Sequence, residues 1–271
     1  MIYNTYQPHP ELEPLVSCYW TLEVPAAEDA QRQRIIPDGT IEIAFILADD
    51  IKRFTSGDEF ILQPRAMVLG QTMDPFYIEP VGAVETFAIR FYPYGFANLV
   101  TVPLSELANK ETPLSVLFGE EDSKDLERKI IQASGVNDRI RIIESFLRGR
   151  LNEPSAVDTI VKRTLDILLR SKGSTPINAI LKDDPSKRRQ LERKFAKTIG
   201  ISPKQLGRVI RLQAALTMLL NEEDDNLASI AYRNEYYDQA HFNKDFKDFT
   251  GISPRQFLND ESMSLSALFY R

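Results

Sequence analysis

Sulfur and imidazole side chains are scarce in this chain of 271 residues, which has one cysteine and two histidines. A single Cys18 cannot form an internal disulfide. With only His9 and His241 available, the chain cannot assemble the histidine and cysteine clusters that bind zinc. We therefore expect neither a metal nor a cofactor. Cys18 stands beside Tyr19 and Trp20, and we interpret it as a small buried apolar side chain.

Long apolar runs are also absent. No stretch approaches the roughly 20 apolar residues that cross a bilayer. The first residues, MIYNTYQPHPELEP, have neither the basic start nor the apolar segment of an export signal. We expect a cytoplasmic protein that does not bind membranes. Its composition, 43% hydrophobic and 27% charged, is typical of one large or two ordinary globular domains.

Positive charge is in the minority overall but concentrated in one half. The net charge is −6, and residues 1–159 hold 14 basic and 25 acidic side chains, a net −11. Residues 160–260 hold 18 basic and 13 acidic side chains, a net +5. Between positions 185 and 211 there are nine basic residues and one acidic residue, Glu192. This asymmetry indicates an acidic sensing half and a basic half that meets a polyanion.

The first half shows the two-residue period of β-strands. After a Pro-Asp-Gly turn, IEIAFIL at 41–47 alternates, and so does ETFAIRFY at 85–92. Strands separated by proline and glycine turns up to about residue 95 predict a sandwich or small barrel. The spacing then becomes helical, with apolar residues at positions 126, 130, 140, 143 and 147. NEPSAVDTI at 152–160 interrupts it, and we place the domain boundary at 154/155.

One motif is written twice in the second half. LERKFAKTIGISPKQL at 191–206 is matched by FNKDFKDFTGISPRQF at 242–257, which begins 51 residues later. Each copy has apolar or uncharged residues at i, i+4 and i+7: Leu191, Phe195 and Thr198, then Phe242, Phe246 and Phe249. This spacing predicts a helix with one buried stripe. The following Gly-Ile-Ser-Pro predicts a left-handed residue past the helix end, then an N-cap serine and a glutamine that closes a capping box.

Each buried stripe is preceded by a shorter apolar helix and a break, which is the pattern of a helix-turn-helix unit. In the first unit the break falls at Asp183-Asp184-Pro185, and we expect the second helix to begin near Ser186. The face opposite the stripe carries Arg189 and Arg193, with Glu192 at its flank. Residues on such a face reach base edges in DNA.

The second unit repeats this organisation. A break at Asn234-Glu235 follows a short apolar helix, and Asp238 is the expected N-cap of the next helix. Its outward face carries Ala240 and Lys244, with Asn243 at the flank. Between the units, Pro203–Leu220 predicts a linker helix of 18 residues, or roughly 27 Å. That length suits two recognition helices in adjacent major grooves, which lie about 34 Å apart.

Residues 174–258 resemble the DNA-binding domain of AraC/XylS-type bacterial transcriptional regulators, through LERKF…GISP and IA…DQAHFNKDFK…GISP. RIIPDGTIEIAFIL and GAVETFAIRFYPYGFANLV are similar to the N-terminal region of a subgroup with a β-rich sensory domain. The family usually has glycine in the second turn, where this chain has Asn234-Glu235. We expect Asn234 to take the positive φ there at modest cost.

The resemblance implies an α+β two-domain fold. Residues 1–154 would form a β-rich sandwich or barrel for sensing and dimerisation, with helices at its end. Residues 155–271 would form an all-α domain of two helix-turn-helix units joined by a linker helix. The implied function is sequence-specific DNA binding and transcription regulation, with two recognition helices in successive major grooves under control of the N-terminal domain.

The resemblance also assigns contacts with double-stranded DNA. The implied base-reading residues are Arg189, Glu192, Arg193, Gln239, Ala240, His241, Asn243 and Lys244. Basic side chains close to these positions are candidates for phosphate contacts: Lys187, Arg188, Lys194, Lys197 and Lys247. Glu192 has two open roles, because it could orient Arg188 or Arg189, or accept a hydrogen bond from a cytosine amino group.

Trp20, Arg90 and Tyr94 are candidates to line an effector pocket, in which Arg90 would meet an anionic ligand. The alternative is that Trp20 belongs to the core and Arg90 pairs with a local carboxylate. Apolar residues at 140, 143 and 147 would either form a dimer helix or pack onto their own barrel. The partners left open are therefore RNA polymerase, a small-molecule effector and a second copy of the chain.

Two other functions compete with a DNA-binding regulator. The basic helices could make the chain an interaction adaptor for an acidic protein. A β-barrel enzyme with an accessory DNA module is the third alternative, but a metal-dependent barrel enzyme needs a histidine cluster, and this half holds only His9. His241 has no serine or cysteine motif beside it. We expect no catalytic residues and no enzyme activity.

Overall fold

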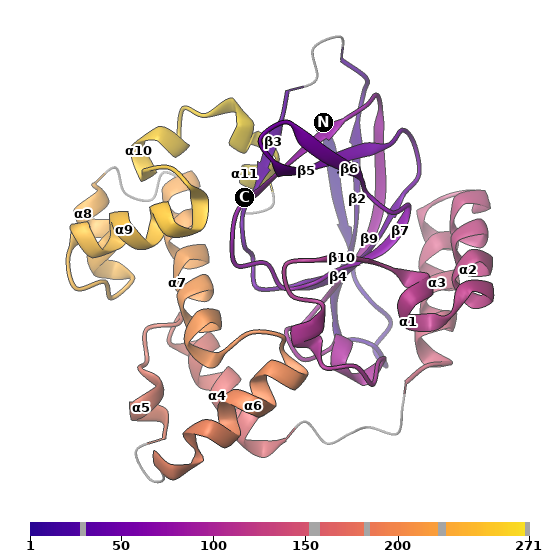
Figure 1. The fold of residues 1–271 in the computed structure, drawn as a ribbon. Helices are drawn as coiled ribbons and strands as arrows, with labels where there is room; N and C mark the ends of the chain where they lie inside the picture. The colour runs from indigo at the N-terminus through magenta and orange to yellow at the C-terminus, as the bar shows by residue number, and fades with distance from the viewer. Residues whose placement is uncertain (28–30, 152–157, 182–184, 222–225, 269–271) are drawn as a thin grey trace.

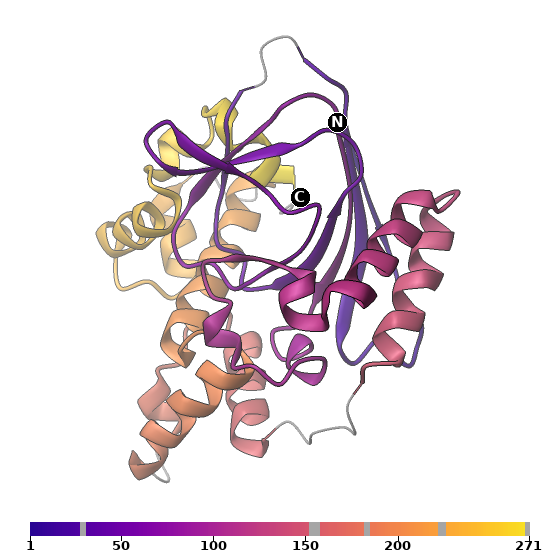
Figure 2. The same ribbon diagram turned by 45° about the vertical axis from the view of Figure 1, so that its right-hand side comes forward.

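The computed structural model describes residues 1–27, 31–151, 158–181, 185–221 and 226–268. Two antiparallel sheets form the N-terminal domain, and the helices between residues 114 and 148 cover one side of it (Figure 1). The helices of the C-terminal half lie on the opposite side. Figure 2, turned by 45°, shows both groups of helices flanking the strands.

A six-stranded sheet is the larger wall of the N-terminal domain. In spatial order its strands are β1 (Ile2–Tyr6), β2 (Val16–Val24), β9 (Val84–Phe91), β4 (Ile41–Ile46), β7 (Ala66–Leu69) and β10 (Glu111–Pro113). The second sheet has the order β3 (Gln33–Ile35), β8 (Phe76–Pro80), β5 (Ile51–Ser56) and β6 (Glu59–Leu62). Strands β3 and β6 are therefore its edges, each with one side open to other contacts.

The central strands β4 and β9 divide their side chains between two surfaces, as their alternation predicts. Phe45 and Phe87 are opposite each other on the helix-covered face, and both are fully buried. On the other face Ala44 is opposite Ala88. Ala44 lines a cavity between the two sheets. One pair of strands thus builds a packed core on one side and the floor of a cavity on the other.

Three helices pack on the larger sheet: α1 (Leu114–Phe118), α2 (Glu120–Gln132) and α3 (Val136–Arg148). Two short 3-10 turns, η1 (Phe96–Asn98) and η2 (Leu104–Glu106), connect β9 to this region. Ile143 and Leu147 of α3 are buried in the core of the larger sheet, and Ile140 is partly buried against it. Of the two interpretations of this apolar face, the structure supports packing onto the chain's own barrel rather than a dimer helix.

The C-terminal half is helical. Its elements are α4 (Thr159–Arg170), α5 (Ile177–Ile180), η3 (Pro185–Lys187), α6 (Arg188–Thr198), α7 (Pro203–Leu220), α8 (Leu227–Arg233), α9 (Gln239–Thr250), α10 (Pro254–Phe257), η4 (Glu261–Met263) and α11 (Ser264–Leu268). The predicted two-domain α+β class is confirmed, and α7 has the predicted bounds. The predicted boundary at 154/155 lies outside the described residues.

Both Gly-Ile-Ser-Pro motifs stop one helix and start the next. Gly200 has a φ of +97°, which an L-residue adopts only with strain. Ser202 Oγ then accepts from the amide of Gln205 at 3.2 Å, and Gln205 Oε1 accepts from the amide of Ser202 at 2.9 Å. The second copy repeats this capping box at 253–256, after Gly251 with a φ of +79°. The predicted caps are confirmed.

The linker helix α7 lies very close to the end of α4. A Cβ added to Gly173 would stand 1.9 Å from the carbonyl oxygen of Gly207, and Gly173 has a φ of +74°. Gly207 itself leaves room for Leu168, whose Cδ2 is 3.3 Å from an added Cβ. The two glycines allow the backbones to approach, which fixes the first unit against α7.

The N-terminal domain also contacts α7, through the turn at 37–39. The side-chain amide of Gln213 donates to the carbonyl oxygen of Pro37 at 2.6 Å. Gln71 Nε2 donates to the carbonyl oxygen of Gly39 at 2.8 Å, and a Cβ on Gly39 would lie 3.3 Å from Val209. The sequence predicts this segment as a turn, and the structure shows that it is also a contact between the domains.

Gly173→Ala is expected to destabilise the chain by at least about 3 kcal/mol, because it adds backbone strain and a clash with the carbonyl of Gly207. Gly57→Ala is the matched control, since Gly57 has a φ of +54° and no atom within 4 Å of an added Cβ. The control should cost only roughly 1 kcal/mol. Urea unfolding of both variants measures the difference, and equal losses would contradict the close approach of α4 and α7.

Candidate functional site

Helix α6 presents the predicted recognition face of the first unit to solvent. Leu191 and Phe195 are fully buried, whereas Arg189 and Arg193 are exposed. Thr198 was expected in the buried stripe but is only half-buried, with its hydroxyl bonded back to its own helix. Two buried positions, four residues apart, are therefore enough to orient the helix.

The start of α6 differs from the prediction. A 3-10 turn over Pro185–Lys187 leads directly into the helix, whose first α-helical residue is Arg188, two residues after the predicted start near Ser186. No side chain among the described residues caps this helix end. The predicted break at Asp183-Asp184 lies outside the described residues.

Ion pairs on α6 distinguish its arginines. Arg188 Nε donates to Glu192 Oε1 at 3.1 Å, and its Nη1 donates to Asn178 Oδ1 at 3.1 Å. Glu192 therefore orients Arg188, which is the first of its two proposed roles. Arg189 and Arg193 make no ion pair within the described part of the chain, so their guanidinium groups face solvent.

Helix α9 begins as predicted, but the turn before it does not. The Asp238 carboxylate accepts from the amide of His241 at 2.7 Å. Glu235, not Asn234, takes the positive φ, at +56°. Asn234 is buried, and its side-chain amide donates to the carbonyl oxygen of Ile230 at 2.9 Å. This bond holds Asn234 at the end of α8, so the left-handed conformation falls on the next residue.

The outward face of α9 carries the predicted base-reading residues of the second unit. Phe242, Phe246 and Phe249 form its buried stripe. The exposed predicted residues are Gln239, Ala240, His241 and Lys244, and Asn243 is half-buried. The structure thus brings this set together on one solvent-facing helix, and Arg189 and Arg193 on another.

Arg208 of α7 fixes α9 in place. Its Nη2 donates to Asp245 Oδ1 at 2.8 Å and to Asp248 Oδ2 at 3.0 Å, and its guanidinium lies over the Phe249 ring. The Asp245 side chain is buried, so this pair is poorly screened by solvent. Arg208 thereby offsets part of the negative charge of Asp245 and Asp248 and attaches α9 to α7.

The candidate phosphate contacts fall into two groups. Lys187, Arg188, Lys197 and Lys247 are exposed. Lys194 is half-buried and bonded to Asp158, the N-cap of α4. A contact of Lys194 with phosphate therefore requires that this ion pair open.

Two exposed tyrosines were not among the predicted contacts. Tyr237 is 92% exposed immediately before the N-cap of α9, and Tyr232 is 83% exposed on α8. Large apolar rings are seldom so open, and tyrosine hydroxyls commonly bond DNA phosphates. The signal in the sequence was the pair Tyr236-Tyr237 before Asp238, of which only Tyr236 is buried.

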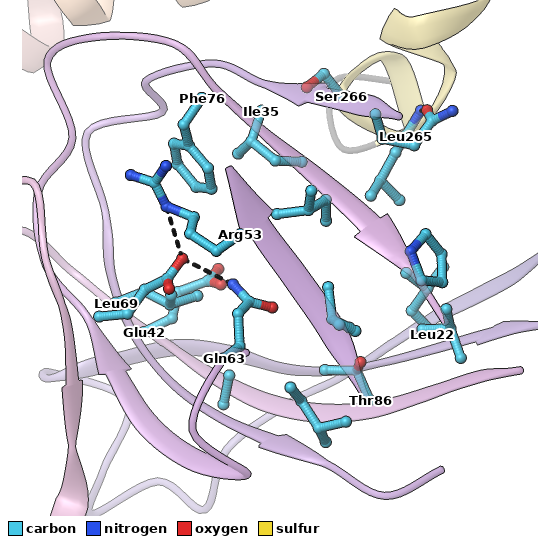
Figure 3. A pocket seen from close by; sticks show the side chains of 18 of the residues that line it. Leu22, Ile35, Glu42, Arg53, Gln63, Leu69, Phe76, Thr86, Leu265 and Ser266 are labelled. Atoms are coloured by element: carbon cyan, nitrogen blue, oxygen red, sulfur yellow. Dashed lines mark hydrogen bonds and ion pairs between the residues drawn. The ribbon is translucent and has the colours of Figure 1, made fainter. Parts of the chain in front are cut away.

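A cavity of about 280 Å³ lies between the two sheets of the N-terminal domain (Figure 3). Its wall is largely apolar and includes Leu22, Ile46, Ile51, Ile78 and Val84. Ala44 and Thr86 of the floor strands β4 and β9 also line it, and their small side chains leave room above the sheet. A cavity of this kind suits a small apolar molecule.

Charged side chains lie at one end of the cavity, in a cross-strand row that also contains Leu69 and extends to Cys18 beyond the cavity wall. Five cross-strand neighbours in register form the row: Cys18, Arg90, Glu42, Leu69 and Glu111. Arg90 Nε donates to Glu42 Oε1 at 2.6 Å, and Arg53 Nε lies 3.1 Å from Glu111 Oε1. Gln63 Nε2 donates to the same Glu111 carboxylate oxygen at 2.7 Å. Both arginines are therefore already paired with acids.

The three residues proposed for the pocket have different positions. Trp20 is buried, lines the cavity and donates to Glu42 at 3.1 Å. Arg90 also lines it, but its pairing with Glu42 favours the local-carboxylate alternative over an anionic ligand. Burial disfavours the charged form of Arg90, but the nearby carboxylates of Glu42 and Asp38 outweigh this effect and raise its pKa. Tyr94 is not in the cavity wall, and packs instead against the core of the first helix-turn-helix unit.

The Cys18 thiol and the Glu111 carboxylate near this end of the cavity have unusual surroundings. Cys18 is half-buried rather than fully buried, and burial raises the pKa of its thiol. Glu111 is mostly buried, and its Oε2 has no hydrogen-bond partner among the described residues. Burial raises the pKa of Glu111 from the usual 4.5, despite the opposing effects of Gln63 and Arg53.

Comparisons with known proteins agree with this geometry. A helix-turn-helix domain family matches residues 186–260, and a "Domain of unknown function (DUF6597)" matches residues 4–113. No curated protein sequence matches the chain significantly. Within the described residues, no helix is long and apolar enough to span a bilayer, and no group of three or more potential metal ligands occurs.

Solved structures of ToxT from Vibrio cholerae are similar in fold. One has a TM-score of 0.50 at 12% identity, covering 91% of this chain and 99% of that chain. ToxT bound to (E)-4-(8-methylnaphthalen-1-yl)but-3-enoic acid has a TM-score of 0.49 at 12% identity, covering 89% and 98%. Wild-type ToxT with an unsaturated fatty acid bound has a TM-score of 0.47 at 12% identity, covering 88% and 93%.

These findings define a two-domain DNA-binding transcription regulator, with a β-rich N-terminal domain and a helical C-terminal region. The C-terminal region is a helix-turn-helix domain of the AraC type, which confirms the resemblance drawn from the repeated motif.

Glu111→Gln is expected to change the pH dependence of stability. A carboxyl whose pKa is higher in the folded chain contributes stability below about pH 4.5, which is lost as the pH rises through its folded-state pKa. In Glu111→Gln this loss should be smaller, because an amide does not ionise and can still accept from Arg53 and Gln63. Urea unfolding at several values between pH 4 and pH 7 measures it, and identical profiles would contradict a raised pKa.

Proposed function

We propose that the chain reads a specific DNA sequence by placing α6 and α9 in successive major grooves. The observation that supports this most is the pair of exposed faces on α6 and α9, which flank one helix, α7, that contacts α4 at Gly207 and bonds α9 through the adjacent Arg208. A helix of this length spans roughly 27 Å. With the width of the helices added, this fits the spacing of about 34 Å between grooves.

Within this proposal the two recognition helices have different chemistry. Arg189 and Arg193 suit guanine, because a guanidinium can donate two parallel hydrogen bonds to its O6 and N7 atoms. On α9, Gln239 and Asn243 suit adenine, and the Ala240 methyl suits the methyl group of thymine. Glu192 positions Arg188 rather than reading cytosine, since the two side chains are already bonded.

Phosphate contacts would fix the register of both helices. Positive charge comes from exposed basic side chains: Lys187, Arg188, Lys197 and Lys247. Tyr237 supplies a neutral hydroxyl beside the start of α9. These contacts do not distinguish sequences. They give binding a strong dependence on salt, because neutralised phosphates release counterions.

The N-terminal domain is proposed to control this binding through a small-molecule effector. The cavity between the sheets supports a mostly apolar ligand. An effector that binds one arrangement of the domains more tightly than the other shifts the chain toward that arrangement. The resulting change in DNA affinity is limited by the ratio of the effector's affinities for the two arrangements. Contact with RNA polymerase and assembly with a second copy stay expectations of the family resemblance.

A first test is selection of bound sequences from random duplexes. We expect two enriched half-sites about 10 base pairs apart, one for each recognition helix. A salt titration of the same duplex should give a linear fall of log affinity with log salt concentration, with a slope of roughly −0.9 for each neutralised phosphate. Failure to enrich any sequence, together with tight binding to acidic proteins, would favour the adaptor.

A second test concerns the proposed base contacts. Arg193→Ala and Lys244→Ala should each weaken binding to the selected sequence by roughly 1–3 kcal/mol and weaken binding to random DNA much less. Arg128→Ala and Lys124→Ala are matched controls, because both residues are exposed on α2 of the N-terminal domain. Fluorescence anisotropy gives both affinities. Equal losses on specific and random DNA would reduce Arg193 and Lys244 to phosphate contacts.

A further inference from the structure

The wall of the cavity includes residues from the far end of the chain. Leu265 and Ser266 of α11 line it, and Figure 3 shows them at the side that also contains Ile35 and Leu22. Leu265 is 8% exposed and belongs to the same apolar cluster as Trp20. A helix that follows the second helix-turn-helix unit therefore completes a cavity in the N-terminal domain.

Strand β3 holds α11 at this place. Gln33 Oε1 accepts from Ser264 Oγ at 2.8 Å and from the amide of Leu265 at 3.2 Å. Ser266 Oγ donates to the carbonyl oxygen of Arg34 at 2.6 Å. Because β3 is an edge strand, its open side is available for these bonds.

The same strand holds the end of the second recognition helix. Arg34 Nη1 donates to the carbonyl oxygen of Thr250 at 2.9 Å. Thr250 is the last residue of α9, where helix carbonyls carry partial negative charge that a cation stabilises. The Arg34 guanidinium also lies 5.0 Å from the centre of the Tyr77 ring. One residue of β3 thus bonds α11 through its backbone and α9 through its side chain.

The chain between the core of the second unit and the cavity wall is too short to allow much independent movement. Met263 is buried in the core of that unit with Phe246 and Phe257. Leu265, two residues later, is buried in the wall of the cavity. Two residues span at most about 7 Å. A displacement of Leu265 is therefore transmitted to Met263 or to β3.

We propose that α11 is a displaceable wall of the cavity and that it couples occupancy of the cavity to the position of α9. An apolar molecule that enters the cavity competes with Leu265 for the same lining. Moving Leu265 strains the bonds of α11 to Gln33 and Arg34, and Arg34 passes the change to the end of α9. This inference rests on the proposed DNA-binding function and adds the route by which a ligand alters it.

The coupling is testable with N-phenyl-1-naphthylamine, an uncharged apolar dye whose fluorescence rises in apolar surroundings. Saturating dye should change the affinity of the whole chain for its selected duplex by about fivefold or more, in the range of known couplings. Saturating duplex should change the affinity for the dye by the same factor, since linkage is reciprocal. Dye should also speed hydrogen exchange over residues 261–268.

Two variants test whether α11, rather than the rest of the cavity, transmits the effect of the dye to DNA binding. Gln33→Ala removes both bonds to the start of α11 and leaves the apolar lining in place, so the dye should bind about fivefold tighter and its effect on DNA binding should fall below about twofold. Leu265→Ala makes room without displacement and should also abolish the effect of dye on DNA. Gln132→Ala, at an exposed end of α2, is the matched control and should behave as the unmodified chain.

The outcomes distinguish this inference from the proposed function. Duplex binding that dye does not alter, or an effect of dye that persists unchanged in Gln33→Ala and Leu265→Ala, would overturn the role of α11 while leaving DNA binding intact. Absence of salt-dependent duplex binding by the unmodified chain would overturn both. Unaltered hydrogen exchange over residues 261–268 on dye binding would show that the wall does not move.

Discussion

Helix α7 is the constraint on which the rest of the structure depends. Its buried residues belong to the cores of both helix-turn-helix units: Leu206 on one side, Val209, Leu212, Leu216 and Leu219 on the other. Its glycine contact fixes α4, Arg208 fixes α9, and Gln213 bonds the turn at 37–39 of the N-terminal domain. Because each part is attached to the same rigid helix, none moves without a change in these contacts.

The N-terminal domain follows a different physical rule, in which one sheet has two faces of opposite character. Large side chains such as Phe45 and Phe87 fill one face, and on the other the smaller Ala44 and Thr86 line a cavity. The charges at the end of this space neutralise each other, which favours an apolar occupant over an anion. The two domains meet again at β3, whose Arg34 bonds both Ser266 in the cavity wall and Thr250 at the end of α9.

Features that depend on neighbours in sequence could be predicted closely. The bounds of α7, both capping boxes, the Asp238 cap and the buried phenylalanines of α9 follow from spacing and from local hydrogen bonds. Predictions failed where a distant or competing contact decided the outcome. Asn234 would tolerate a positive φ, but its side chain bonds Ile230 and the strain moves to Glu235.

The candidate site shows the same division. The sequence by itself determined the helices α6 and α9, their outward residues and the helix between them, because periodicity and caps act over a few residues. Only the tertiary structure decided that Arg90 is neutralised by Glu42, that Tyr94 packs outside the cavity and that Leu265 closes it. The physical reason is distance along the chain: Arg34 and Thr250 are brought together by the packing of two domains, and no local pattern encodes such a pair.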